Sequence, residues 1–213
     1  DATNGPLTIR AASGASPVFA ASGTIDILNP TTSSSIVIRG ITFTCPANRR
    51  GIYCAASSTT ILIENCKFNV SGDGSFGIYL ACTAQYVSVR NCYFYNTNGA
   101  TGGSGFTMYS GRGFVSVEAC EFNGCDAYSI GLFGGTALSM VSVDRCISYN
   151  AQSDGLNISS NIFDRVYITN CTFYGNGSDG IDISSAAAIE HLITIYNCLF
   201  VNNTNYGIRG PSN

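Results

Sequence analysis

The apolar residues of this chain alternate with polar ones at a period of two. One clear stretch runs from Ile61 to Phe68, where Ile61, Ile63, Cys66 and Phe68 are the apolar positions. Successive side chains of a β-strand point to opposite faces, so this alternation predicts short strands with apolar residues inward and Ser, Thr or Tyr outward. No segment shows a helical period long enough for an amphipathic helix.

The same phrase recurs along the chain at steps of 25, 26, 28, 26, 25 and 27 residues. These steps separate the residues at one marker position: Ile41, Cys66, Cys92, Cys120, Cys146, Cys171 and Cys198. A glycine followed by a large apolar residue comes after each marker: Gly51, Gly77, Gly105, Gly131, Gly155, Gly180 and Gly207. Repeats of this length indicate a solenoid. The period of two makes it an all-β solenoid of about seven regular coils.

Each copy predicts one coil of three strands. The first strand ends at a tight bend, where Asn65 or its counterpart tolerates a left-handed backbone and Gly40 fits the same demand. Cys-x-Phe forms the second strand with both residues inward, and Ser148 replaces Phe in one coil. The glycine begins the third strand, whose second inward position is expected to hold Cys54, Leu80, Met108, Ile158 and Ile183, with gaps at Gly134 and Gly210.

The phrase Asn-Cys-x-Phe with a following Gly-Ile resembles the coils of the right-handed parallel β-helix family, which includes pectate lyases, polygalacturonases and phage tailspikes. The resemblance covers about residues 36–210 and implies a right-handed parallel β-helix as one continuous domain over 36–213. Residues 1–35 are expected to form a tail and an irregular first coil. In that coil, strands at 7–9 and 25–27 are joined by small residues 11–23. The resemblance concerns architecture and does not specify an activity.

Charge is sparse, at 11% of the 213 residues with a net charge of −3. We find no run of basic residues that would bind nucleic acid and no apolar run that would span a membrane. Glu64, Arg90 and Glu118 alternate in sign at one outward position, which predicts charge compensation between coils. Because the first residue is Asp1, we expect that a signal peptide was removed or that the chain is a fragment, and that the protein is extracellular.

Ten cysteines would usually indicate a disulfide framework. Six of them share the marker position, which favours a ladder of buried thiols, since a free cysteine behaves as a small hydrophobe. Cys54 falls on an inward position, whereas Cys45, Cys82 and Cys125 remain candidates for cross-links. Because no Cys-x-x-Cys occurs, we expect no zinc, and nothing indicates another metal or a cofactor.

The outward row of the third strand is the first candidate site. We expect this row to be Tyr53, Tyr79, Thr107, Phe133, Asn157, Asp182 and Arg209. Binding would involve Tyr53, Tyr79, Phe133, Asn157 and Arg209. The rings can cover one another as a packing ladder, contact another protein, or stack on sugar rings, and the sequence leaves these three interpretations open.

Three carboxylates form the second candidate site. Asp154 and Asp179 both precede a repeat glycine, and Asp182 follows closely, so the three are expected on neighbouring coils. Two such carboxylates can act as acid and base or nucleophile in glycoside cleavage. Residues 178–182 also resemble one polygalacturonase motif, but the paired Asp-Asp, Gly-His-Gly and Arg-x-Lys of that family are missing here. The structural interpretation is that Asp-Gly makes a turn and that Asp182 pairs with Arg209.

Two functions from different classes follow. The first is a secreted, non-enzymatic structural β-solenoid that self-associates into a filament, sheath or fibre through open coil ends and the outward aromatic row. The second is a domain that binds or cleaves polysaccharide, as a lyase or glycosidase. The missing catalytic sets favour the first: the only histidine, His191, lacks a catalytic context, and Asp126, Asp144 and Asp164 are too scattered to hold calcium.

Overall fold

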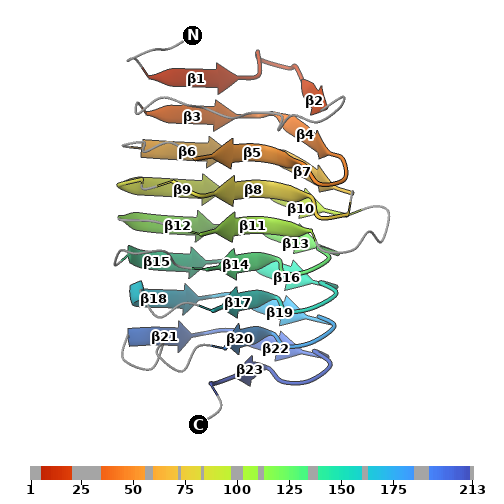
Figure 1. The fold of residues 1–213 in the computed structure, drawn as a ribbon, viewed down its shortest axis with the longest axis vertical. Coiled ribbons are helices and arrows are strands. Elements are labelled where there is room, and N and C mark those ends of the chain that lie inside the picture. Colours follow the sequence, from red (N-terminus) through yellow and green to blue (C-terminus); the bar gives the residue numbers. More distant parts are fainter. Residues whose placement is uncertain are drawn as a thin grey trace.

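The computed structural model describes residues 6–20, 35–55, 60–71, 73–82, 84–96, 103–109, 113–133, 139–159, 163–184 and 192–211. Within these ranges all regular structure is β-strand, and the chain winds as a parallel β-helix along one long axis (Figure 1). From β3 (Ile36–Arg39) onward each coil adds one strand to each of three sheets, so the predicted solenoid is confirmed. No helix in the described part of the chain is long and apolar enough to cross a membrane.

The three sheets contain every strand of the described residues. The first sheet consists of β1 (Leu7–Arg10), β3 (Ile36–Arg39), β6 (Thr60–Glu64), β9 (Tyr86–Arg90), β12 (Phe114–Glu118), β15 (Ser139–Asp144), β18 (Phe163–Thr169) and β21 (Leu192–Tyr196). The second consists of β2 (Val18–Ala20), β4 (Thr42–Cys45), β7 (Lys67–Val70), β10 (Tyr93–Tyr95), β13 (Glu121–Asn123), β16 (Ile147–Tyr149), β19 (Thr172–Tyr174) and β22 (Leu199–Val201). The third consists of β5 (Arg50–Cys54), β8 (Phe76–Leu80), β11 (Ser104–Met108), β14 (Ile130–Leu132), β17 (Leu156–Ile158), β20 (Ile181–Ile183) and β23 (Ile208–Arg209).

The start of the chain belongs to the same sheets. β1 pairs with β3 and confirms the strand predicted at residues 7–9. The segment 11–23 was expected only to connect two strands, but Val18–Ala20 form β2 and pair with β4. Phe19 draws this strand into the core, because its ring packs edge-on against Phe43 at 5.8 Å between centroids. The strand predicted at 25–27 lies outside the described residues.

A left-handed residue closes the first strand of each coil, as predicted. The backbone angle φ is 53° at Asn65 and 69° at Gly40. The same bend occurs at Asn91, Ala119, Arg145, Asn170 and Asn197. A second row of left-handed residues follows the second sheet, and sequence reasoning treated it only as a loop. Its members are Asn48, Gly74, Gly124, Asn150, Gly175 and Asn202. Asn and Gly dominate both rows because they accept positive φ at low cost.

Aromatic rings fill the core beside the second sheet. Phe68, Phe94 and Phe122 are fully buried, and their rings stack with centroids 4.7 and 4.6 Å apart. Phe43 extends this stack at one end, whereas Phe173 and Phe200 form a separate stacked pair. Ser148 interrupts the series, as the sequence indicated. The stack therefore consists of two segments with a polar position between them.

The cysteine ladder is a row of thiols that hydrogen-bond to the backbone. The Sγ of Cys66 donates to the carbonyl of Glu64 at 3.3 Å, and each later member donates in the same way to the residue two positions earlier. All ten cysteines are free, and all but Cys198 are buried. Burial raises the pKa of Cys45 and of Cys125 to about 12, which keeps both thiols protonated and unreactive. Because Cys45, Cys82 and Cys125 are buried, the predicted cross-links through them to other molecules are wrong.

Five of the repeat glycines lie against a phenylalanine of the next coil: Gly51, Gly77, Gly105, Gly155 and Gly180. A Cβ on Gly105 would lie 2.6 Å from the ring of Phe122, and one on Gly77 would lie 2.7 Å from Phe94. At β14 both members of this glycine–phenylalanine pair are replaced by serine. Ser129 stands where the other coils have glycine, Ser148 stands where they have phenylalanine, and the Oγ of Ser148 donates to the Oγ of Ser129 at 2.8 Å.

This exchange corrects the register predicted for one coil. Ile130, and not Leu132, pairs with Phe106, so Leu132 pairs with Met108 and fills the second inward position. The prediction that Gly134 leaves a gap at this inward position is therefore wrong, because Leu132 fills it. Gly134 itself lies outside the described residues. Gly131 falls on the outward row, where the ring of Phe133 covers it: a Cβ there would lie 2.5 Å from that ring.

The Ser129–Ser148 pair yields a test. Ser148→Phe alone should lower the free energy of unfolding by about 1–3 kcal/mol, because the new ring has no room beside the Ser129 side chain. Adding Ser129→Gly should restore most of that loss, since the ring then stacks between Phe122 and Phe173. Urea denaturation of both single variants and the double variant measures the coupling. Additive effects would contradict this explanation of the repeat glycines.

Candidate functional site

The outward row of the third sheet holds most of the residues predicted to form a site. Strand register places Tyr53, Tyr79, Thr107, Gly131, Asn157, Asp182 and Arg209 in one line, one residue per coil. Phe133 was expected in this line but lies two residues after Gly131, directly beyond the end of β14. The row divides into an aromatic half on β5 to β14 and a polar half on β17 to β23.

Rings of the aromatic half cover one another. Tyr79 stacks on Tyr109 and Tyr109 stacks on Phe133, each at 5.0 Å between centroids. At the other end the guanidinium of Arg50 lies 4.1 Å from the ring centre of Tyr53 and 4.4 Å from that of Tyr79. Such contacts stabilise the surface through stacking and cation–π attraction. They also occupy ring faces on which a sugar would stack, which favours the packing interpretation.

Sequence reasoning missed Tyr109 and Arg50 as members of this cluster. Tyr109 directly follows the last residue of β11, and Phe133 directly follows the last residue of β14. The two therefore stand at equivalent positions once Ile130 is paired correctly with Phe106. The wrong register for β14 concealed that equivalence. Arg50 is the first residue of β5, and its guanidinium lies over the rings of Tyr53 and Tyr79. No sequence pattern indicates this position.

The three candidate carboxylates lie together in the polar half and are buried. Asp154, Asp179 and Asp182 have 3%, 0% and 2% of their surface exposed. The Nδ2 of Asn157 donates to the Oδ2 of Asp154 at 3.2 Å and to the Oδ2 of Asp182 at 3.1 Å. The Oδ1 of Asn157 is buried without a hydrogen-bond partner. Asn157 is therefore the link between neighbouring coils.

The Asp-Gly turns also join one coil to the next. The Oδ1 of Asp154 accepts the backbone N–H of Asp179 at 3.0 Å, and the Oδ1 of Asp179 accepts the N–H of Tyr206 at 3.0 Å. Each carboxylate thus satisfies a backbone donor one coil further along. These bonds give Asp a structural role before the repeat glycine, consistent with the structural interpretation from the sequence.

Arg209 is the counter-charge of this cluster, and its predicted pairing with Asp182 is confirmed. Its Nε and Nη2 donate to the two carboxylate oxygens of Asp182 at 2.8 and 2.6 Å, and its Nε also lies 3.1 Å from Asp179. The hydrogen bond to Asp182 raises the pKa of Arg209 above its usual range, so the guanidinium stays charged. One guanidinium thus faces the three carboxyl groups of the cluster.

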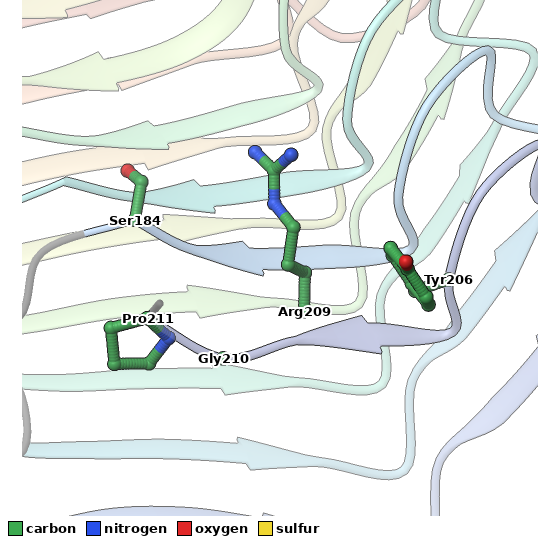
Figure 2. Close-up of a pocket in the computed structure, with 5 residues that line it drawn as sticks. All are labelled: Ser184, Tyr206, Arg209, Gly210 and Pro211. Atoms are coloured by element: carbon green, nitrogen blue, oxygen red, sulfur yellow. The ribbon is translucent and has the colours of Figure 1, made fainter. Parts of the chain in front are cut away.

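A cavity of about 450 Å³ lies beside Arg209. Figure 2 shows its guanidinium between Ser184 and Tyr206, with Gly210 and Pro211 completing the lining. The Tyr206 ring is 60% exposed. The buried carboxylates themselves do not line this cavity. A hydroxyl-rich ligand there would meet Arg209 and Tyr206 before it met any acid.

Charged residues of the first sheet compensate one another between coils at Arg39, Glu64 and Arg90, but the alternation ends at Glu118, whose neighbour on the next coil is Asp144. Glu64 is only 5% exposed and pairs with both Arg39 and Arg90. Arg145 pairs with Glu118 and, at 2.9 Å, with Asp144. Within the residues that the structure describes, no group of three or more His, Cys, Asp or Glu side chains is arranged to hold a metal. His191 lies outside those residues.

The comparisons with known proteins identify the architecture. A family model described as "Right handed beta helix region" matches residues 18–142. No curated protein and no solved structure matches the chain. The family and the three parallel sheets agree with the fold expected from the repeated phrase. They carry no information about a substrate or partner.

Asp126 is a carboxyl group whose pKa shift can be tested. It is buried, its Oδ1 accepts hydrogen bonds from Asn96 at 2.7 Å and Gln152 at 2.9 Å, and its Oδ2 has no partner. Burial raises its pKa from 3.8 to about 6. The folded state therefore binds this proton more tightly than the unfolded state. The free energy of unfolding therefore falls as pH rises between about 4 and 6. Above pH 6 the full destabilisation from the ionised, buried Asp126 is present.

We predict that Asp126→Asn removes this pH dependence. Relative to the wild type, the variant should gain stability as pH rises from 4 to 7, on the order of 1–3 kcal/mol. Urea denaturation at several pH values measures the difference. Asp164→Asn is the matched control, because that carboxylate is exposed beside Arg165. A pH-independent difference between Asp126→Asn and the wild type would contradict the assignment.

Proposed function

The chain belongs to the right-handed β-helix family, and we propose that it is a non-enzymatic structural subunit of an extracellular filament, sheath or fibre. In this proposal the β-helix is a rigid spacer, and copies associate end to end or side by side. The main support comes from the candidate site itself. The three carboxylates that catalysis would need are buried and bonded to neighbouring coils.

The stacked rings support the same function. In a glycosidase, two carboxyl groups flank the scissile bond and must reach it. Here Asp182 is held by Arg209 and Asn157, and Tyr79 is covered by Tyr109 and Arg50. Polar and aromatic side chains of the row thus bind each coil to its neighbours. A structural protein gains from this use, since neighbour contacts carry the stability of a repeat array.

Exposed apolar side chains supply surfaces for association. On the last coil Leu192, Tyr196, Leu199, Tyr206 and Ile208 are 43–71% exposed. β21, β22 and β23 are edge strands of their sheets, and an edge strand can pair with a strand of another molecule. We propose that a second copy stacks there, as an additional coil would. The aromatic row of the third sheet is the proposed lateral contact.

Self-association of the purified chain tests this function. Sedimentation velocity over a wide concentration range should show species larger than one chain, and electron microscopy should show rods longer than one β-helix. Leu199→Glu together with Ile208→Glu should shorten the rods, because burying two unpaired charges at the end contact is unfavourable. Arg165→Glu is the control, because Arg165 is exposed on the first sheet of an interior coil. A monomer at every concentration would overturn the proposal.

Saccharide binding is the second candidate, and the cavity beside Arg209 favours it. A pocket of about 450 Å³ lies within the size range of small-ligand sites. It offers a guanidinium, the hydroxyl of Ser184 and the exposed face of Tyr206. This pocket points to binding and not to cleavage, because the carboxylates are buried behind it.

A glycan panel tests the second candidate. If it holds, a bound oligosaccharide should lose at least about tenfold in affinity in Tyr206→Ala, since the ring supplies the apolar surface of the pocket. Tyr196→Ala is the matched control, because Tyr196 is an exposed tyrosine of the same coil that does not line the pocket. Release of reducing ends that persists in Asp179→Asn plus Asp182→Asn would place any cleavage elsewhere. Equal affinity in both tyrosine variants would exclude the pocket.

A further inference from the structure

The outward face of the second sheet is long and almost uncharged. Its two rows, here called the second-sheet face, are defined by strand register. One row is Val18, Thr42, Lys67, Tyr93, Glu121, Ile147, Thr172 and Leu199. The other row is Ala20, Thr44, Asn69, Tyr95, Asn123, Tyr149, Tyr174 and Val201. In Figure 1 these strands stack in a single column from β2 to β22.

Lys67 and Glu121 are the two charged residues of this face. They lie in one row, on either side of Tyr93 and one coil from it. Lys67 is the only lysine of the chain, it is exposed, and it has no ion pair within the described residues. Glu121 accepts the hydroxyl of Tyr149 at 2.6 Å and has no cationic partner there. In the first sheet, by contrast, the carboxylates of Glu64, Glu118 and Asp144 all pair with arginines of the molecule.

We propose that a second copy of this chain packs on the second-sheet face, related by a twofold axis that runs along β10. Such an axis keeps each row opposite itself and reverses the order of the coils. Tyr93 then faces Tyr93 of the second copy, and Lys67 of each copy faces Glu121 of the other. This inference rests on the proposed structural function and adds a second lateral contact, on the second sheet, to the one proposed at the aromatic row.

Side-chain sizes agree with this antiparallel arrangement. The same axis sets Thr42 opposite Ile147, and Ala20 opposite Tyr174. Ile147 and Tyr174 are each 45% exposed, so large apolar side chains of one half meet small side chains of the other. Two β-sheets pack face to face at about 10 Å, which accommodates a large and a small residue at each position.

A parallel arrangement of the two copies is unfavourable. If the axis ran along the β-helix, each coil would face the same coil of the second copy. Lys67 would then lie near Lys67, and Glu121 near Glu121. Like charges held opposite each other oppose association, so the two charges of this face select the antiparallel pair.

The area of the second-sheet face sets the expected affinity of the dimer. Seven facing strands, from β2 to β19, span about 29 Å at about 4.8 Å per step, and each strand adds about 10 Å of width. The contact is thus about 300 Å² of plane surface per copy, below the roughly 800 Å² per partner of a standard stable interface. We therefore expect a weak, reversible dimer whose affinity falls with salt.

Charge reversal tests the arrangement. Lys67→Glu and Glu121→Lys should each weaken dimerisation in sedimentation equilibrium by at least about tenfold, because each turns two attractive pairs into two repulsive ones. The double variant should recover the wild-type constant to within about threefold. Arg165→Glu is the control, an exposed charge reversed on the first sheet. Circular dichroism and thermal unfolding confirm that every variant is folded.

Cross-linking gives an independent measurement. A bismaleimide of about 10 Å reach should join Thr42→Cys to Ile147→Cys when the two variants are mixed, but join neither variant to itself. Wild-type protein controls for the partly exposed Cys198. Cross-linking of each variant to itself, or a double charge variant that fails to recover, would overturn the antiparallel face.

The outcomes also separate this inference from the proposed function. If the wild type forms rods and single charge reversals leave all association unchanged, the face is wrong and the structural function stands. If the reversals abolish side-by-side pairing while single rods persist, both stand. A wild type that never associates overturns both.

Discussion

The left-handed bend between the first and second sheets is the constraint on which the coil depends. It turns the chain within one residue, and the φ of 50–55° there is almost identical from Asn65 to Asn197. Once the bend is set, the next residue must point inward. Cysteine suits this place because it is small and apolar, and because its thiol can donate to the carbonyl two residues earlier. Ala119 and Arg145 adopt the same angle without the help of an Asn or Gly. Stacking therefore enforces the bend even where local preference opposes it.

Register between coils then makes every residue a neighbour of its own counterpart. Rings meet rings, as Phe68, Phe94 and Phe122 show, and such stacks are favourable. Charges would meet like charges, so the first sheet alternates Arg39, Glu64 and Arg90. Side-chain volumes also compensate between coils, so that a small residue on one coil faces a large one on the next. Gly105 makes room for Phe122, whereas Ser129 and Ser148 share the space at the next step.

These rules explain how much could be predicted from the sequence. Strands, bends and inward rows follow from local demands that recur in each copy, so they were predictable. The Asp182–Arg209 pair was predictable as well, because both residues stand in one row a coil apart. The register of β14 was not, since residues 129–132 contain an apolar residue at both candidate positions. What decides between them is the contact of Ser129 with Ser148, which no local pattern reveals.

Internal pairing also determines what remains for contact with other molecules. The first sheet pairs Glu64, Glu118 and Asp144 with arginines of the chain, and the third sheet binds its carboxylates to Arg209 and to the backbone. The second-sheet face carries two charged residues, Lys67 and Glu121, and each coil adds only a small contact area to it. Affinity must therefore accumulate over many coils, as it does for multivalent contacts. A β-helix meets this requirement because its rows are straight and evenly spaced. In the proposed dimer, two charges on one such face fix the orientation of the second copy, while the area of the face sets its affinity.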